Sequence, residues 1–576
     1  MFLFVLLSSC GGGGGRQANV PVLPPGNAPS PPPAGADANL ANLEATPGSL
    51  DQLFQPSLRS YTMQVGFLTS SIRVVAAVSD PAADLTLNTA PLSSGVPSGP
   101  IPLVEGLNTI NLEVTGADGM TRQSYELGVT RRPLSSFSQR AYLKSSASDS
   151  EDYFGTSMDG HADTLAVGVP SEDSGIAGDP GDNSLLDSGA VFVFVRSSTG
   201  DWHQQDYLKP DTFDSGDRFG SSVAVHGDLL AVGALGEDSS ATGVGGDETD
   251  NGHPDSGAVY VFARDSTGNW AQEAFLKASN SGDGERFGET LTLQNNTLII
   301  GSTRFANLVG RVWVFERDSA GIWTEVDQFQ ASDGTSDSAF GFDLDLQDDT
   351  LAVGAPYHGG IGNFYGAVYV FNRNTSGLWQ ETAMFRGPNT DRLDSFGQSV
   401  ALTENMLAVA AGGESSAATG IDGDQLDNNA AYSGAVYLFV KDSNNDWLPE
   451  TYFKASNTDS GDFFGSQLAF NGDRLLVSAS AEDSASTGVG GDQGDNGLAD
   501  AGAVYGFSRD SNGTWTQDMY VKSSSTGAND VFGRQLVLTE IFMAVGAPFE
   551  DSRADGINGD DSDNAGQQSG AVYVFE

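Results

Sequence analysis

Phe219-Gly220-Ser221-Ser222-Val223-Ala224-Val225 is the stretch that decides the fold, together with Leu229-Leu230-Ala231-Val232-Gly233-Ala234, which follows it after a tight turn. A third apolar run spans Gly257 to Phe262, and a fourth runs from Trp270 to Lys277 after a short Asp/Ser/Gly turn. Short runs rich in β-branched and aromatic residues, bounded by turn residues, are typical of β-strands. Four such runs in succession predict one four-stranded antiparallel sheet.

This four-strand unit is repeated along the chain. Each copy begins with the dipeptide Phe-Gly, and the gaps between successive copies are 53 to 68 residues. The seven copies start at Phe154, Phe219, Phe287, Phe340, Phe396, Phe464 and Phe532. Radial repetition of a four-stranded antiparallel sheet is the architecture of a β-propeller. We therefore predict an all-β protein in which residues 136–576 form a seven-bladed β-propeller.

The two ends of the repeat region complement each other. The seventh copy stops at Glu576, directly after its third strand, whereas Phe137–Lys144 aligns with the fourth strand Trp270–Lys277. This N-terminal strand is predicted to pair with Ala571–Phe575 and to close the last blade, which removes two exposed sheet edges. In the other six copies the fourth strand carries a tryptophan, for which we predict packing between blades. These residues are Trp202, Trp270, Trp323, Trp379, Trp447 and Trp515.

Several of these features match a known repeat. The Phe-Gly pairs, the Gly-Ala-Pro sequences at 354–356 and 546–548, and the Gly-Ala-Val-Tyr strands resemble the FG-GAP repeat of integrin α-subunit propellers. The resemblance covers the chain from about residue 136 to its C-terminus. It implies a propeller that serves extracellular binding or adhesion.

Residues 38–133 form a separate small unit. Alternating runs such as Tyr61–Val65 and Ile110–Val114 are separated by turn residues, for example Gly106–Thr109. Strands of this length and spacing predict an antiparallel β-sandwich. The closing pattern from Gly106 to Arg131 resembles the bacterial cadherin-like β-sandwich family, which implies a spacer or adhesive module.

The first residues of the chain predict where the protein is located in the cell. An apolar run from Met1 leads into Leu7-Ser8-Ser9-Cys10, which resembles a bacterial lipobox, in which the cysteine is acylated after signal cleavage. Residues 1–10 are therefore predicted to be a lipoprotein signal with Cys10 as the lipidated residue, although no Lys or Arg precedes the apolar run. Gly11 provides no acidic retention signal, so we predict a lipid anchor in the bacterial outer membrane, at the cell surface. Residues 11–37, rich in Gly, Pro, Ala and Asn, are predicted to form an extended stalk.

The charge balance narrows the choice of partners. The 576 residues include 27 basic and 76 acidic side chains, a formal net charge of −49. Such a surface repels phosphate backbones, so nucleic acid is excluded as a partner, while an extracellular protein or glycan remains possible. Cys10 is the only cysteine, so no disulfide forms within the chain.

Five of the seven repeats carry a long acidic insertion between the second and third strands. Its shared core is Asp-x-x-Asp-Asn, usually preceded by Glu-Asp-Ser, as at Glu237-Asp238-Ser239. The five cores are Asp179, Asp182, Asn183; Asp247, Asp250, Asn251; Asp424, Asp427, Asn428; Asp492, Asp495, Asn496; and Asp560, Asp563, Asn564. A second acidic residue stands two positions before most Phe-Gly pairs, at Asp152, Asp217, Glu285, Asp394, Asp462 and Asp530. In an antiparallel blade both elements lie in loops on the same side, so we predict one carboxylate-studded face.

Two interpretations of these loops stay open. Clustered Asp and Asn oxygens suit Ca²⁺, which takes six to eight oxygen ligands, and the repeated spacing makes calcium the predicted cofactor. The alternative is a solvated acidic surface. Integrin propellers that bind calcium use the loop between strands one and two, which is too short here, as at His226-Gly227-Asp228. The integrin calcium residues therefore cannot be transferred to this chain.

Catalytic patterns are weak. The five histidines, His161, His203, His226, His253 and His358, stand at unrelated positions of the repeat, and neither His-Glu-x-x-His nor Gly-x-Ser-x-Gly occurs. We predict that the protein is not an enzyme but a calcium-dependent binding or adhesion module for an extracellular protein or glycan. A structural envelope or matrix component without a specific ligand is the alternative, and a propeller hydrolase or lyase is a weaker third.

Overall fold

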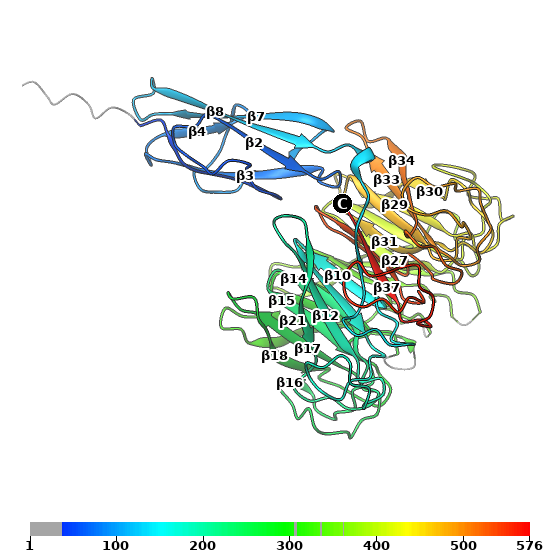
Figure 1. Ribbon diagram of the computed structural model, residues 1–576. Coiled ribbons are helices and arrows are strands. Elements are labelled where there is room, and N and C mark those ends of the chain that lie inside the picture. The colour runs from blue at the N-terminus through cyan, green and yellow to red at the C-terminus, as the bar shows by residue number, and fades with distance from the viewer. Residues whose placement is uncertain (1–36, 305–307, 335–336, 361) are drawn as a thin grey trace, which may run out of the picture.

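A computed structural model describes residues 37–304, 308–334, 337–360 and 362–576. Two parts follow each other along the chain, a small β-sandwich and a larger body of seven sheets (Figure 1). A 3₁₀ turn at Leu134–Ser136 links them. The predicted signal and Cys10, and the predicted stalk up to residue 36, lie outside the described residues.

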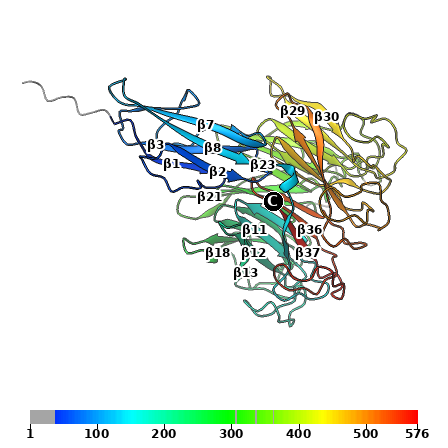
Figure 2. The same cartoon turned by 45° about the horizontal axis from the view of Figure 1, so that its top comes forward.

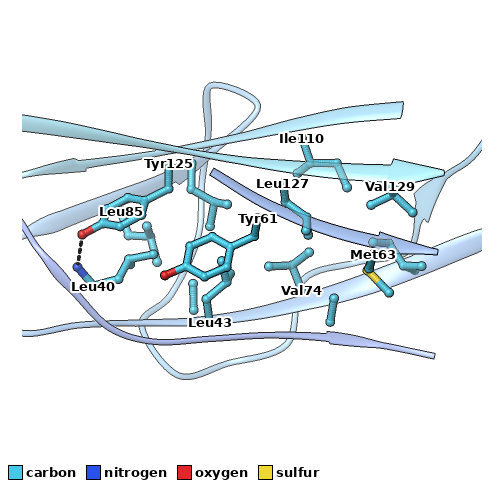
Figure 3. Close-up of a cluster of buried hydrophobic side chains, with 14 of the residues drawn as sticks. Leu40, Leu43, Tyr61, Met63, Val74, Leu85, Ile110, Tyr125, Leu127 and Val129 are labelled. Carbon is cyan, nitrogen blue, oxygen red and sulfur yellow. Dashed lines mark hydrogen bonds between the residues drawn. The ribbon is translucent and has the colours of Figure 1, made fainter. Parts of the chain in front are cut away.

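The sandwich has two sheets that face each other across one apolar core. The first has the strand order β1 (Leu40–Thr46), β3 (Ser71–Val78), β6 (Ile101–Pro102). The second has the order β2 (Ser60–Val65), β8 (Arg122–Arg131), β7 (Gly106–Thr115), β4 (Asp84–Leu87), β5 (Ala90–Pro91). Tyr61 and Tyr125 are buried between the sheets, and the Tyr125 hydroxyl accepts a hydrogen bond from the backbone N–H of Leu40 at 2.9 Å (Figure 3).

Three details of the predicted sandwich are wrong. It is not wholly antiparallel, because β2 pairs with β8 in parallel. The predicted turn Gly106–Thr109 lies inside β7, and β1 was not predicted. An irregularity in the register between Leu40 and Asn42 breaks the alternation of apolar residues in β1, which hides the strand in the sequence.

Seven sheets make up the rest of the chain, each with four antiparallel strands; six follow sequence order, and the seventh takes its fourth strand from the N-terminal side. The first four are β10 (Ser157–His161), β11 (Thr164–Val169), β12 (Ala190–Arg196), β13 (Trp202–Leu208); β14 (Phe219–His226), β15 (Leu229–Ala234), β17 (Ala258–Arg264), β18 (Trp270–Lys277), with β16 (Gly243–Val244) added at the edge; β19 (Thr290–Gln294), β20 (Thr297–Ser302), β21 (Arg311–Arg317), β22 (Trp323–Phe329); and β23 (Leu344–Gln347), β24 (Thr350–Ala355), β25 (Ala367–Arg373), β26 (Trp379–Phe385). The last three are β27 (Phe396–Leu402), β28 (Met406–Ala411), β29 (Ala435–Lys441), β30 (Trp447–Phe453); β31 (Phe464–Phe470), β32 (Arg474–Ala479), β33 (Ala503–Arg509), β34 (Trp515–Val521); and β35 (Gln535–Leu538), β36 (Met543–Ala547), β37 (Ala571–Phe575), β9 (Gln139–Leu143). These sheets have the form of propeller blades.

The Phe-Gly dipeptide has a separate task for each residue. Phe219 is fully buried, with its ring centroid 5.7 Å from that of Tyr260 and 5.9 Å from that of Phe262. Gly220 has a φ of +91°, and a Cβ on it would lie 2.4 Å from the carbonyl oxygen of Ala190 in the preceding sheet. The phenylalanine therefore fills the core, while the glycine permits close approach of two sheets.

Neighbouring sheets are joined by a repeated pair of backbone hydrogen bonds. Between the first and second sheets the N–H of Phe219 donates to Ser188 O at 3.1 Å, and that of Arg218 donates to Asp187 O at 3.0 Å. The junction between the seventh and first sheets has the same two bonds, Phe154 N to Ser569 O at 2.9 Å and Tyr153 N to Gln568 O at 3.2 Å. The last and first sheets are thus in contact through the same geometry as sheets adjacent in sequence.

The N-terminal strand completes the last sheet. β9 pairs antiparallel with β37, with Leu143 opposite Val572 and Ala141 opposite Val574. Four of the six tryptophan side chains, Trp202, Trp270, Trp323 and Trp515, contact a residue of a neighbouring sheet, as predicted for inter-blade packing. Trp202 of the first sheet, for example, packs edge-on against Phe542 of the seventh with ring centroids 4.8 Å apart.

The sandwich rests against the sixth and seventh sheets (Figures 1 and 2). Phe67, in the turn after β2, is buried against Phe137 with ring centroids 5.9 Å apart. The guanidinium of Arg474 lies 4.5 Å from the centre of the Phe67 ring, and Thr69 Oγ1 donates to the carbonyl of Glu540 at 2.6 Å. Apolar packing and polar contacts together fix the sandwich on this side of the body.

Candidate functional site: the acidic loop face

The two acidic elements of the repeat lie side by side. In the first sheet Asn183 Nδ2 donates to Asp149 Oδ2 at 3.0 Å, so the long insertion contacts the loop that leads into the sheet. Three further loops repeat this contact, from Asn251 to Asp214 at 3.0 Å, Asn428 to Asp391 at 2.9 Å and Asn496 to Asp459 at 2.8 Å. The insertions therefore share one face with the loops between sheets, as connectivity predicted.

The first aspartate of each core shapes its own loop. Asp247 Oδ1 accepts the backbone N–H of Thr249 at 3.0 Å, while the Asp247 carbonyl accepts the Ser239 hydroxyl at 2.7 Å. The Thr249 hydroxyl lowers the pKa of the exposed Asp247 carboxyl. The equivalent residues Asp179, Asp424, Asp492 and Asp560 each accept the N–H two positions further on. These carboxylates act first as turn formers.

The second aspartate spans its loop in three copies. Asp182 Oδ2 accepts the N–H of Gly175 at 2.8 Å, Asp250 Oδ2 that of Ser240 at 2.9 Å, and Asp495 Oδ2 that of Ala485 at 2.9 Å. Asp427 instead accepts a hydrogen bond from the side chain of Asn429. Asp563 and Asn564 occupy the corresponding places before β37.

The arrangement does not assemble a calcium shell. Across the described residues, no group of three or more His, Cys, Asp and Glu side chains is placed to hold a metal ion. Most of the core carboxylates face backbone N–H groups, and four of the asparagines turn their NH₂ groups toward a carboxylate. Because Ca²⁺ needs six to eight converging oxygens, the loops in this arrangement do not fit the ion. Calcium binding stays a prediction from the sequence spacing.

Five of the six acidic residues before the Phe-Gly pairs are not surface carboxylates, contrary to the prediction, and the sixth, Glu285, is half-buried. Asp152, Asp217, Asp394, Asp462 and Asp530 are buried, and Asp217 Oδ2, for example, accepts the N–H of Asp214 at 2.7 Å. Burial raises the pKa of Asp152 to about 8, of Asp217, Asp462 and Asp530 to about 7, and of Asp394 to about 6. Each of these aspartates is buried because it stands two residues before a phenylalanine of the core.

A buried ion pair anchors each insertion, and sequence reasoning missed it. The glutamate that follows the second strand pairs with a lysine at the end of the fourth strand of the same sheet. The five pairs are Lys209–Glu172 (2.7 Å), Lys277–Glu237 (2.6 Å), Lys454–Glu414 (2.9 Å), Lys522–Glu482 (2.9 Å) and Lys144–Glu550 (3.0 Å), all with lysine side chains 0% exposed. The available signal was the lysine count, because the chain has only six lysines and five of them stand at this one position of the repeat.

Further hydrogen bonds surround these ion pairs, although the second carboxylate oxygen of Glu414 is buried without one. Lys277 Nζ also donates to Ser256 Oγ at 2.7 Å, and Glu237 Oε1 accepts the N–H of Ser239 at 3.0 Å. In the first sheet the Tyr207 hydroxyl donates to the second oxygen of Glu172 at 2.7 Å. Burial raises the pKa of Glu237 and lowers that of Lys277, and each partner's charge opposes the other's shift. Such bonding offsets the desolvation of a buried ion pair.

The two sheets without the insertion also lack the pair. In the fourth sheet Arg386 takes the place of the lysine and His358 that of the glutamate, with His358 Nε2 2.6 Å from Asp333 Oδ2. In the third sheet Gln330 stands at the lysine position and donates to Gly310 O at 3.1 Å. Insertion, glutamate and lysine therefore occur together or not at all.

A polar cavity of about 500 Å³ lies between the first strands of all seven sheets. Three aspartates that line it brace neighbouring strands: Asp159 accepts the N–H of Val225 at 2.7 Å, Asp343 that of Val400 at 2.8 Å, and Asp345 that of Leu402 at 2.6 Å. Burial raises the pKa of Asp159 and Asp343 to about 6 and that of Asp345 to about 7. These carboxylates serve strand edges that would otherwise expose unpaired N–H groups.

The histidines do not gather into one constellation. His161 and His226 lie together at the turns of the first two sheets, with ring centroids 4.3 Å apart. His253 Nδ1 lies 2.6 Å from Asp283 Oδ1 on the acidic side, while His203 is exposed on β13.

Comparisons with known proteins identify both parts of the chain. Residues 39–132 match the cadherin-like beta sandwich domain, and residues 202–262 and 323–371 match the FG-GAP repeat. The chain therefore contains a cadherin-like sandwich and FG-GAP repeats, both non-catalytic domain types. Over 106 residues it is 32% identical to a protein of Evansella cellulosilytica named "Putative membrane protein"; the match covers 18% of this chain and 16% of that protein. Within the described ranges, no helix has the length and apolarity to cross a membrane.

Proposed function

We propose that this protein is a non-catalytic binding module of the bacterial cell surface. In this proposal the seven sheets form one closed propeller, the sandwich is a spacer, and the acidic loop face meets an extracellular protein or glycan. The observation that carries it is the construction of that face, where five loops of one design are each anchored by a buried ion pair. Preorganised loops on a rigid scaffold are a common form of binding surface.

Binding measured with two charge-matched variants tests this role. The loop variant carries Asp179→Asn, Asp247→Asn and Asp492→Asn, and the control carries Asp348→Asn, Asp446→Asn and Asp473→Asn, exposed residues in turns at the opposite ends of the strands. Residues 38–576 immobilised on a sensor are screened against purified bacterial polysaccharides and surface proteins. We expect ligands to be lost with the loop variant and kept with the control. Equal binding by both variants would move the site elsewhere, and no ligand at all would favour the structural alternative.

The surface location rests on the lipobox-like Leu7-Ser8-Ser9-Cys10. Expression of the full chain in a Gram-negative host with an alkyne-labelled fatty acid tests it. We expect label on the wild type and none on Cys10→Ser, and an unlabelled wild type would reject the lipid anchor.

Calcium dependence is a separate prediction, supported by the repeated Asp-x-x-Asp-Asn spacing in five loops. Thermal unfolding of residues 38–576 in EDTA and in millimolar calcium measures it, because an ion that binds the native state raises the midpoint. An unchanged midpoint would leave the loops as a solvated acidic surface. The proposed binding role holds with either result.

A further inference from the structure

In four of the five acidic loops the lysine contacts oxygen atoms from both ends of the insertion, whereas Lys522 contacts only Glu482, because Ala501 stands where the other loops have a serine. Lys144 Nζ donates to Glu550 Oε2 at 3.0 Å, to the Ser552 carbonyl at 2.7 Å and to Ser569 Oγ at 2.7 Å. Lys454 Nζ donates to Glu414 Oε2 at 2.9 Å, Ser433 Oγ at 2.7 Å and Gly434 O at 2.6 Å. One positive charge thus holds the start of the loop against its end.

The position of the glutamate and serine partners explains how the ammonium acts on the whole loop. In the second sheet Glu237 stands just after β15 and Ser256 just before β17, so the two partners of Lys277 bracket the insertion. Lys277 itself comes from the end of β18, a rigid part of the sheet. A loop clamped at both ends to a strand has lost most of its freedom before its tip makes any contact.

The residues predicted to bind metal lie elsewhere in the loop. Asp247 is exposed and Asp250 is half-buried, and both accept backbone N–H groups of the loop, whereas Glu237 is 3% exposed. At the base of the loop, the ammonium group of the lysine already neutralises the charge of the buried glutamate. The two sheets that lack the insertion have Gln330 and Arg386 in place of this lysine.

We propose that the five buried lysines are the structural cations of the acidic loops, so that the loops fold without a divalent metal ion. Each lysine side chain supplies from within the chain the positive charge and the bracing that a bound calcium would otherwise supply. A divalent ion that binds the exposed carboxylates would then be an addition to a loop already formed. This inference concerns how the loops are built and does not rest on the proposed binding role.

Amine acetylation read by peptide mass spectrometry tests the proposal on the unmodified protein. Lys441 is the one lysine whose side chain reaches solvent, where it lies beside Trp447, and it serves as the internal reference. We expect the other five lysines of native residues 38–576 to react more slowly than Lys441 by more than about tenfold, in EDTA as in calcium, because reaction requires local opening. Lysines that become reactive in EDTA would overturn the proposal.

Two variants of the second sheet separate the lysine from a metal. Glu237→Gln removes the charge partner of Lys277 and keeps the side-chain shape, and we expect Lys277 alone to become reactive. Asp247→Asn with Asp250→Asn removes the carboxylates that a metal would need, and we expect Lys277 to stay protected. The other four buried lysines report in the same spectra whether either variant has unfolded. Protection in the first variant, or exposure of Lys277 in the second with the other four lysines still protected, would reject the assignment.

Discussion

Lys277 ends an alternating strand, a place where a lysine would ordinarily reach water, yet its side chain is completely buried. Its ammonium group donates hydrogen bonds to Glu237 and Ser256, which belong to the insertion. The sequence of the strand alone does not predict these partners. Asp217 behaves in the same way, because its neighbour Phe219 is a core residue and carries it below the surface. At the residue scale, polarity alone therefore does not predict exposure in this protein.

Lys277→Met tests the stability that one ion pair contributes. The substitution leaves Glu237 buried without its partner, so we expect the free energy of unfolding to fall by about 3–5 kcal/mol. Lys441→Met, at the partly exposed lysine, should stay within about 0.5 kcal/mol of the wild type. Denaturant unfolding followed by tryptophan fluorescence measures both. Equal losses in the two variants would contradict a special role for the buried pair.

Asp217 also predicts a pH dependence. Burial raises its folded-state pKa to about 7, above the usual value of 3.8, so its stabilising contribution is complete below pH 3.8 and is lost as pH rises through about 7. Asp217→Asn keeps an acceptor for the N–H of Asp214 and does not titrate. We expect the thermal midpoint of this variant relative to wild type to be higher at pH 8 than at pH 5. A difference independent of pH would show that the folded-state pKa of Asp217 is not raised above its usual value.

At the scale of strands and sheets, much of the architecture could be predicted from sequence. The Phe-Gly dipeptide, the alternating strands and the place of β9 beside β37 follow from patterns that each repeat confirms. Strand β1 could not be found, since an irregularity near Leu40 breaks its alternation, and the parallel pairing of β2 with β8 depends on partners distant in sequence. The loop anchors were missed because a glutamate and a lysine about 40 residues apart show no local pattern.

Removing β37 tests the role of the last sheet. A chain that ends at Ser569 lacks the strand between β36 and β9 and leaves both with unpaired edges, so we expect aggregation or loss of a cooperative thermal transition. A chain that ends at Phe575 loses only Glu576, whose carboxylate pairs with Arg196 at 2.7 Å, and should melt cooperatively slightly below the wild type. A soluble, normally melting chain ending at Ser569 would refute the role of this strand.

For the whole molecule, the position of the sandwich against the seven sheets depends on contacts of a few residues in the turn after β2. Phe67 lies between the guanidinium groups of Arg131 and Arg474, at 5.5 and 4.5 Å from its ring centre, and Arg474 also pairs with Asp518 at 2.9 Å. Leu68, next in the chain, is 1% exposed. These contacts could not be predicted from repeats or periodicity in the sequence, because each of them occurs only once. They make the sandwich a fixed extension of the seven sheets.

Phe67→Ala should release this fixed geometry without unfolding either part. Loss of the ring removes its packing against Phe137 and leaves Arg131 and Arg474 facing each other, so we expect the sandwich to move about the linker at Leu134–Ser136. Small-angle scattering of residues 38–576 should then show a larger radius of gyration and a longer maximum dimension than in the wild type. Met120→Ala, at a side chain 86% exposed on the sandwich, is the control and should leave the scattering curve unchanged. An unchanged curve for Phe67→Ala would mean that other contacts, such as Thr69 with Glu540, suffice to hold the sandwich in place.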